Sequence, residues 1–153
     1  MAKKSKWNKR FIDLAFKVAS WSKDPSCRVG AVVVSKDKLH FALGYNGLPR
    51  KVEDSEERLQ ISGKKLKLTV HAEVNAILNA PVRPDGWSLY ATRMPCLCCA
   101  LVIVQSGITK VYCPLIDTSS KWAQSQQESL ALFEETGIKV VWLNKGELQH
   151  ELI

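Results

Sequence analysis

Three side chains that could bind a metal and one carboxylate occupy two short segments of this sequence. His71 and Glu73 are two positions apart, and Cys96 and Cys99 are three apart, directly after a proline. Residues three apart on a helix share a face, so Cys96 and Cys99 can hold one ion while Cys98 points elsewhere. One imidazole nitrogen and two thiolates suit Zn²⁺ and leave a fourth tetrahedral position for water. The sequence therefore predicts one catalytic zinc per chain, with His71, Cys96 and Cys99 as ligands.

Glu73 has the position of a proton carrier. It is too close to His71 in the chain to chelate beside it, yet it can reach over the open zinc position. Both segments are expected to begin helices, whose N-terminal N–H groups and positive dipole end stabilise thiolates. The combination H-x-E and P-C-x-x-C is typical of zinc-dependent nucleobase deaminases, in which the glutamate is not a ligand. We therefore expect hydrolysis at C4 of a cytosine ring, with Glu73 moving protons to N3 and to the departing ammonia.

The composition is that of one soluble globular domain covering residues 1–153. Hydrophobic residues make up 46% of the chain and charged residues 24%. No apolar run approaches the roughly 18 residues of a membrane span, and no apolar segment follows the basic start, so we expect a cytoplasmic protein and no membrane partner. The five cysteines, three of them within four positions, indicate metal binding rather than a disulfide framework.

The hydrophobic pattern predicts strands that alternate with helices along most of the chain. The chain begins with one helix, which a hairpin of two strands follows. A polar segment with a possible short helix comes next. Such alternation requires crossover connections, and it predicts an α/β fold, a three-layer α/β/α sandwich with a mixed, largely parallel central sheet. The expected helices are 6–22, 53–60, 71–80, 99–107 and 122–136, and the expected strands are 29–34, 40–45, 88–92, 110–113 and 138–143.

Longer strings around the metal motifs resemble the deoxycytidylate deaminases. They span most of residues 20–113, and GYNG ahead of HAEVNAIL distinguishes this branch from nucleoside and tRNA deaminases. The resemblance implies a sandwich of the cytidine deaminase type that converts dCMP to dUMP for thymidylate synthesis. It also implies a homohexamer that dCTP, with Mg²⁺, activates and dTTP inhibits. The strings are SKDPSCRVGAVVV (22–34), GYNGLP (44–49), HAEVNAIL (71–78), MPCLCCALVIVQSGI (94–108) and KVYC (110–113).

The resemblance also implies roles for single residues. His71, Cys96 and Cys99 match the family's zinc ligands and Glu73 its proton carrier. Asn46 matches the loop asparagine expected at the sugar, and the N–H of Ala72 would hold the base O2. The segment associated with the nucleotide effector is Gly44, Tyr45, Asn46 and Gly47, although an ordinary Asn-Gly turn is the alternative. Arg50 and Lys51 depart from the family, which commonly has a small residue and glycine there.

A monophosphate needs cationic or N–H partners, which we expect to be Lys23 and Arg28 in the loop before the first strand. Trp122 is expected to cover the base. The alternatives are surface charges for the first two residues and core packing for the tryptophan. Cys27 and Cys113 are expected in the core or in strands, and Cys98 as a packed or partly exposed thiol.

Two other functions compete with this interpretation. The formal net charge of +7 and five tryptophans would suit a deaminase of RNA or single-stranded DNA. Trp7, Trp21 and Trp142 fit predicted helix and strand positions, however, so few aromatics remain for stacking bases, and we do not expect nucleic acid as a partner. A non-catalytic zinc module is the second competitor, but it would need neither Glu73 nor an open zinc position.

Overall fold

A five-stranded mixed sheet forms the centre of the computed structural model, which describes residues 2–60 and 67–144, with side chains from residue 6 onward. The strands lie in the order β2-β1-β3-β4-β5. The hairpin of β1 (Gly30–Val34) and β2 (Phe41–Tyr45) is antiparallel, and so is the pairing of β1 with β3 (Ser88–Ala91). The parallel pairs are β3 with β4 (Lys110–Pro114) and β4 with β5 (Lys139–Leu143), and a helical crossover connects the two strands of each pair.

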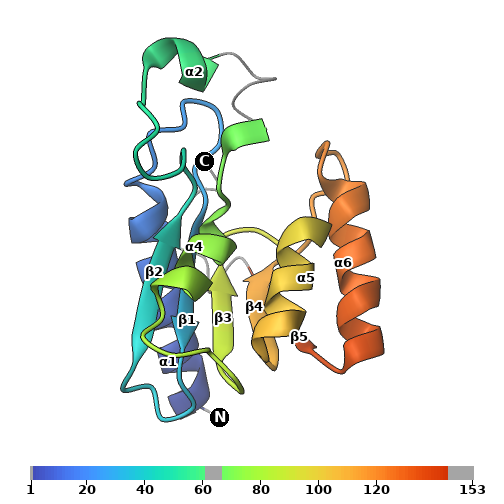
Figure 1. Cartoon of the computed structure of the whole chain (residues 1–153). Coiled ribbons are helices and arrows are strands. Elements are labelled where there is room, and N and C mark those ends of the chain that lie inside the picture. Colours follow the sequence, from blue (N-terminus) through green and yellow to red (C-terminus); the bar gives the residue numbers. More distant parts are fainter. Residues whose placement is uncertain (1, 61–66, 145–153) are drawn as a thin grey trace.

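Helices cover both faces of the sheet, which confirms the predicted three-layer architecture (Figure 1). Helix α1 (Ala2–Ala19) packs on one face against β1, β2 and β3. The other face carries α4 (Ala72–Asn79), α5 (Leu97–Ser106) and α6 (Ala123–Thr136). The short helix α2 (Glu56–Gln60) belongs to the polar segment and buries no residue. None of the helices in the described ranges is long and apolar enough to cross a membrane.

Strand β1 lies between the two layers of helices and is buried on both sides. Val32 and Val34 join the cluster that contains Phe11 and Ile12 of α1. Ala31 and Val33 alternate with them and join the larger cluster under α4, α5 and α6. The continuous apolar run that predicted this strand is thus explained by burial on two faces rather than one.

Two glycines let helices lie directly on the sheet. A Cβ at Gly30 of β1 would collide with the carbonyl oxygen of Ala15 in α1. A Cβ at Gly44 of β2 would collide with the carbonyl oxygen of Ala72 and the backbone nitrogen of Ala76 in α4. Gly44 therefore fixes how closely α4 approaches β2, and so where the start of α4 lies.

Helix α4 is also tied to the outer edge of the sheet by two asparagines one turn apart. The amide of Asn75 donates to the carbonyl oxygen of Tyr45 at 2.8 Å, and that of Asn79 donates to the carbonyl oxygen of Leu43 at 2.8 Å. Both carbonyls belong to β2, the edge strand. Hydrogen bonding thus adds to close packing in holding α4 in place.

Candidate metal centre and active-site cavity

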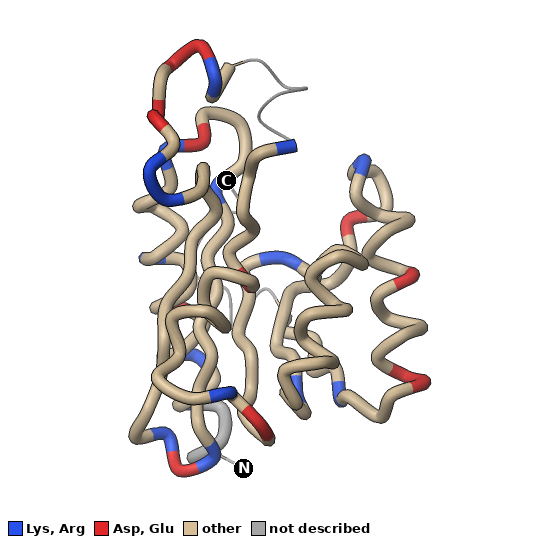
Figure 2. The backbone as a smooth tube through the Cα atoms, viewed as in Figure 1, with Lys and Arg blue, Asp and Glu red and all other residues tan. Residues whose placement is uncertain are grey.

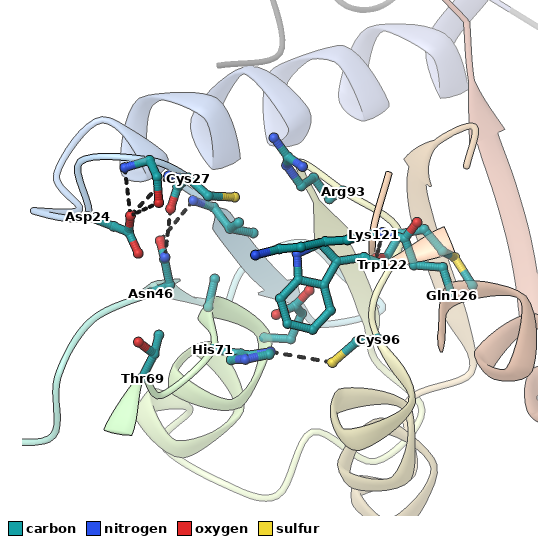
Figure 3. A pocket seen from close by; sticks show the side chains of 15 residues that line it. Asp24, Cys27, Asn46, Thr69, His71, Arg93, Cys96, Lys121, Trp122 and Gln126 are labelled. Atoms are coloured by element: carbon teal, nitrogen blue, oxygen red, sulfur yellow. Dashed lines mark hydrogen bonds between the residues drawn. The ribbon is translucent and has the colours of Figure 1, made fainter. Parts of the chain in front are cut away.

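The three predicted ligands meet where α4 and α5 begin. His71 and Cys96 are the residues immediately before these helices, and both have extended backbone angles (φ −74°, ψ 154° and φ −75°, ψ 169°). Nδ1 of His71 lies 3.4 Å from Sγ of Cys96 and 3.3 Å from Sγ of Cys99 (Figure 3). The three donor atoms all lie within 4.8 Å of one another. Cys98 is exposed and lies outside this group, as the helical spacing predicts.

The donor set fits a tetrahedral zinc ion. Zinc bonds of about 2.0–2.3 Å at tetrahedral angles place neighbouring nitrogen and sulfur donors about 3.5 Å apart, close to the separations seen here. Neither His71 nor Cys96 caps its helix with a side-chain hydrogen bond, so both side chains are directed to the shared point. The helix N-termini add a positive field that stabilises thiolate ligands.

The two ligand thiols differ in their affinity for protons. Hydrogen bonds from Cys99 and from His71 lower the pKa of Cys96 to about 4 despite its burial. The hydrogen bond between Cys99 and Cys96, together with burial and the nearby Glu73, raises the pKa of Cys99. The hydrogen bond to Cys96 also raises the pKa of His71. The group thus contains one ready thiolate and a proton that a bound cation would displace.

Glu73 lies beside the ligands but is not one of the three. Its side chain is only 4% exposed, and Oε2 accepts a hydrogen bond from Sγ of Cys99 at 3.5 Å. Burial raises the pKa of Glu73 above its ordinary value, because the interior disfavours the charged carboxylate. This combination suits a group that accepts and returns protons.

A cavity of about 110 Å³ opens onto His71, Glu73 and Cys96. Three further predicted site residues line it, namely Asn46, Ala72 and Trp122. The ring of Trp122 stands edge-on to His71, with centroids 6.1 Å apart at 89°. The structure therefore brings together most of the residues that the sequence assigned to chemistry and to the base (Figure 3).

Asn46 lines the cavity, but its amide is already engaged with the backbone. Oδ1 accepts a hydrogen bond from the N–H of Val29 at 2.8 Å, and Nδ2 donates to the carbonyl oxygen of Cys27 at 2.9 Å. The buried Ser22 hydroxyl donates to the carbonyl oxygen of Asn46 at 2.8 Å. Asn46 thus ties the loop before β1 to the end of β2, and this loop forms one wall of the cavity.

The other GYNG residues do not line the cavity. Gly44 packs against α4, and Gly47 forms an isolated bridge with Val70. Tyr45 is 42% exposed, and its ring meets that of Trp21 edge-on at 6.2 Å. Packing therefore accounts for Gly44 without a ligand.

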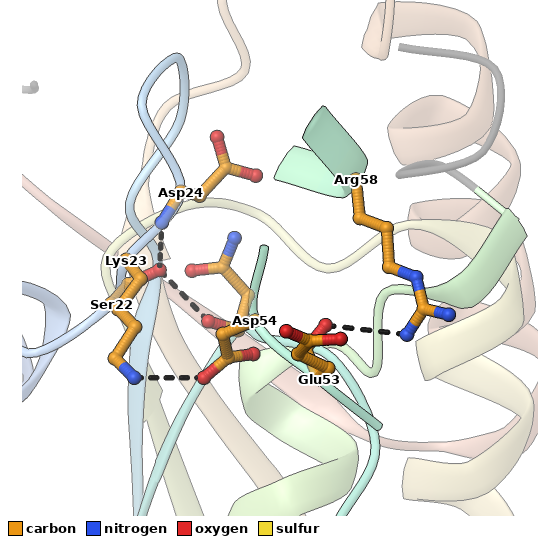
Figure 4. A network of polar contacts seen from close by, with 7 residues as sticks. Ser22, Lys23, Asp24, Glu53, Asp54 and Arg58 are labelled. Carbon is orange, nitrogen blue, oxygen red and sulfur yellow. Dashed lines mark hydrogen bonds and ion pairs between the residues drawn. The ribbon is translucent and has the colours of Figure 1, made fainter. Parts of the chain in front are cut away.

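Lys23 and Arg28 are not placed for the phosphate role expected from the sequence. Lys23 is outside the cavity lining and forms an ion pair with Asp54 at 2.8 Å, which raises its pKa (Figure 4). Nε of Arg28 donates to the carbonyl oxygen of Asp24 at 3.4 Å; Asp24 lines the cavity, but Arg28 does not. The loop before β1 does contribute residues to the cavity, but Lys23 and Arg28 are not among them.

Two cations that the sequence reasoning missed do line the cavity, Arg93 and Lys121. Each was adjacent to a residue already singled out, since Arg93 precedes the Pro-Cys motif and Lys121 precedes Trp122. Nζ of Lys121 lies 5.6 Å from the centroid of the Trp122 ring. Cys27 also lines the cavity; it is in a loop and partly exposed, contrary to the core or strand position expected for it. Cys113 is buried in β4, as expected.

Helix α6 forms hydrogen bonds with the segment that carries Cys96, and no pattern in the sequence indicates this contact. Oγ of Ser125 accepts a hydrogen bond from the N–H of Leu97 at 2.9 Å, and Nε2 of Gln126 donates to the carbonyl oxygen of Met94 at 2.9 Å. Both bonds fix the chain on either side of Cys96. The orientation of this zinc ligand thus depends on a helix some thirty residues further along.

Comparison with known proteins agrees with this geometry. Residues 5–115 match the family model for the cytidine and deoxycytidylate deaminase zinc-binding region. An uncharacterized deaminase of Aliivibrio fischeri is 45% identical over 141 residues, which cover 91% of this chain and 95% of that protein. Human deoxycytidylate deaminase is 34% identical over 143 residues, which cover 86% of this chain and 76% of that protein.

Solved structures share the fold. The dCMP deaminase of cyanophage S-TIM5, solved in complex with dCMP and dUMP, has a TM-score of 0.73 at 23% identity, covering 90% of this chain and 97% of that one. RibD of Acinetobacter baumannii has a TM-score of 0.63 at 22% identity, covering 89% of this chain and 35% of that one.

Proposed function

The chain belongs to the zinc-binding cytidine and deoxycytidylate deaminases, and from this premise we propose that it hydrolyses dCMP to dUMP and ammonia. The observation that carries the proposal is that Glu73 lines one cavity with His71 and Cys96, two members of the His71, Cys96 and Cys99 group. Relatives named deoxycytidylate deaminase at 34–36% identity support the choice of substrate. The dUMP would supply thymidylate synthesis.

His71, Cys96 and Cys99 would hold the zinc. When bound, zinc supplies Lewis-acid activation of a water as the nucleophile. We assign the N–H of Ala72, at the start of α4, to the base O2, and Trp122, which also lines the cavity, to a face of the base. The Glu73 carboxylate takes one proton from the water and delivers it to N3. It then takes the proton of the new hydroxyl at C4 and delivers it to the leaving amino group of the base. Its burial limits competing exchange with solvent.

Arg93 and Lys121 are the residues that we assign to the 5′-phosphate. Both line the same cavity as the ligand group, and both carry a charge opposite to that of a phosphate. A guanidinium can bind phosphate oxygens in a bidentate manner, and an ammonium adds a second point charge. This pair replaces Lys23 and Arg28 in the proposal.

Initial rates on dCMP, CMP, deoxycytidine and dCTP, measured beside a cytosine-containing oligonucleotide, test the proposal. We expect the highest kcat/KM for dCMP, with deoxycytidine much poorer because it lacks the phosphate. Turnover of the oligonucleotide alone would replace the proposal with a nucleic acid deaminase. Stoichiometric zinc without turnover of any substrate would favour a non-catalytic zinc module.

Regulation and assembly form a second part of the proposal, supported by the likeness to deoxycytidylate deaminases. We propose that dCTP with Mg²⁺ activates the enzyme and dTTP inhibits it, through Tyr45, Gly47 and their neighbours in a homohexamer. Exposed apolar side chains near α4, α5 and β4 would be covered in such an assembly, namely Leu78, Leu101 and Leu115. Sigmoidal dCMP kinetics that dCTP makes hyperbolic are the expected result, and indifference to both triphosphates contradicts it.

A further inference from the structure

A second hollow lies on the opposite face and at the opposite end of the sheet from the metal centre. It has a volume of about 700 Å³, within the range of small-molecule sites. Helix α1 packs against β1, β2 and β3, so on this side its first turns form one wall and the strands form the floor. We call this hollow the basic groove, because four lysines line it, namely Lys36, Lys38, Lys110 and Lys139.

The sheet register places these lysines close together. Val34 of β1, Ser88 of β3, Lys110 of β4 and Lys139 of β5 are successive pairing partners, so they form one row across four strands. Neighbouring strands lie about 4.8 Å apart, so the side chains of Lys110 and Lys139 are side by side. Lys36 follows Val34 by two residues and lies across Gly86 at the same end of the sheet.

Acidic residues also lie at this end of the sheet, but those that are described are not paired with the four lysines (Figure 2). All four lysines are exposed. Asp37 is the nearest acid in sequence, but its Oδ1 accepts hydrogen bonds from Ser35 and from the N–H of Leu39, and it does not line the groove. Like charges held this close repel one another, and a polyanion would relieve that repulsion.

The floor and wall of the basic groove add aromatic surface to the charge. Tyr90 and Tyr112 both line the groove and stack with centroids 4.4 Å apart and planes 6° apart. Tyr90 is only 3% exposed, so the accessible ring surface of the floor belongs to Tyr112. Trp7 of α1 lines the wall and is 39% exposed. Aromatic faces beside ammonium groups suit a ligand with a heterocyclic base and phosphates.

We propose that the basic groove binds a nucleoside triphosphate, with its phosphates along Lys36, Lys110 and Lys139 and its base against the aromatic surface. A single nucleotide fits the arrangement better than a polynucleotide, because the four lysines surround one hollow instead of following a path over the surface. The site is separate from the catalytic cavity. Lys110 and Lys139 begin the parallel strands β4 and β5, whereas Cys96 follows the far end of β3.

Calorimetric titration of the zinc-loaded full chain tests the proposal, with excess dUMP present to fill the catalytic cavity. ATP is the probe, and adenosine and inorganic tripolyphosphate separate the contributions of base and phosphates. We expect ATP to bind more tightly than either fragment. The variant Lys110→Gln/Lys139→Gln should weaken ATP binding about tenfold or more, since two charge-assisted contacts are lost. Lys36→Gln/Lys38→Gln should weaken it in the same direction.

The control is Lys17→Gln/Arg83→Gln, which removes the same charge from exposed positions outside the groove. It should change ATP affinity less than twofold. Equal losses in groove and control variants would indicate a general charge effect and overturn the proposal, as would absence of ATP binding at millimolar concentration. Tighter binding of a single-stranded oligonucleotide than of ATP, lost in the same groove variants, would also overturn it in favour of a polynucleotide.

Discussion

Oδ1 of Asn46 accepts a hydrogen bond from the backbone N–H of Val29 at 2.8 Å. The asparagine expected at the substrate sugar is therefore first a structural residue, and its amide holds the loop that forms one wall of the cavity. A substrate hydroxyl would have to use the remaining lone pair or N–H of this amide.

Asn46→Ala should therefore lower the stability of the protein even without substrate. The substitution leaves the N–H of Val29 and the carbonyl oxygen of Cys27 without their side-chain partner, at a cost of about 1–3 kcal/mol each if water cannot replace it. Chemical denaturation of the ligand-free protein measures the loss. Asn79→Ala is the control, because its hydrogen bond to Leu43 is exposed and should be worth less. A destabilisation that appears only with substrate bound would contradict the structural role.

Gly44→Ala and Gly47→Ala should differ sharply although both lie in the GYNG segment. The new methyl at Gly44 would collide with the backbone of α4, whereas nothing lies within 4 Å of the one at Gly47. We expect Gly44→Ala to cost about 1–3 kcal/mol of folding free energy and to lower turnover, because α4 must shift with His71 and Glu73. Denaturation midpoints and kcat for both variants are the measurements. Equal stability of the two would show that α4 does not rest on Gly44.

Zinc affinity should rise with pH. In the metal-free group Cys96, with a pKa of about 4, is already ionised at neutral pH, whereas the raised pKa of Cys99 keeps that thiol protonated. Binding must release this proton, and also the proton of His71 wherever that residue, whose pKa is raised, is protonated. The apparent affinity therefore increases by at least about tenfold per pH unit. Competition with a chelator between pH 6 and 8 measures the slope. Cys98→Ser should keep the same slope, Cys99→Ser should lose most affinity, and a flat profile would refute the assignment.

Glu73→Gln should abolish most turnover of dCMP and leave zinc in place. Loss of the proton carrier lowers kcat by about 10²–10⁴-fold, and the side chain is outside the ligand group. Metal analysis and initial rates on the same preparation separate the two effects. The matched control is Glu128→Gln on the exposed face of α6, which should retain full activity. A Glu73→Gln protein that holds zinc and turns over at the normal rate would exclude this residue as the carrier.

Arg93→Gln and Lys121→Gln should act on the phosphate. Each removes a charge-assisted contact worth about 1.5–3 kcal/mol, so kcat/KM for dCMP should fall by about 10- to 100-fold while that for deoxycytidine changes little. Lys23→Gln and Arg28→Gln are the controls, since neither side chain lines the cavity. Parallel losses on both substrates would mean that the two cations support the fold rather than bind phosphate.

The metal centre could be predicted from sequence because its chemistry is local. Helical spacing separates Cys98 from Cys96 and Cys99, and helix N-termini direct His71 and Cys96 to one point. The order of strands and helices could be predicted from hydrophobic patterns, because these patterns also depend on residues that are close in sequence. Each such inference depended on neighbours within a few residues along the chain.

The orientations of the cationic side chains around the cavity were harder to predict, because they depend on partners that are distant in sequence. Lys23 turns to Asp54, thirty-one positions away, and this pairing leaves no local trace in the sequence. Arg93 and Lys121 reach the cavity from two crossover segments that only the assembled sheet brings together. Likewise, Gly44 resembled part of a ligand-binding segment, and only the three-dimensional contact with α4 shows its packing role.

The two asparagines on α4 have a consequence for solubility. The edge of a sheet exposes unpaired carbonyl oxygens that a strand of another molecule could join, which is a route to aggregation. Asn75 and Asn79 occupy two such oxygens on β2, at Tyr45 and Leu43, with side-chain donors. Helix α4 thus makes these two oxygens of the edge strand unavailable to a strand of another molecule, while its first turn carries Glu73.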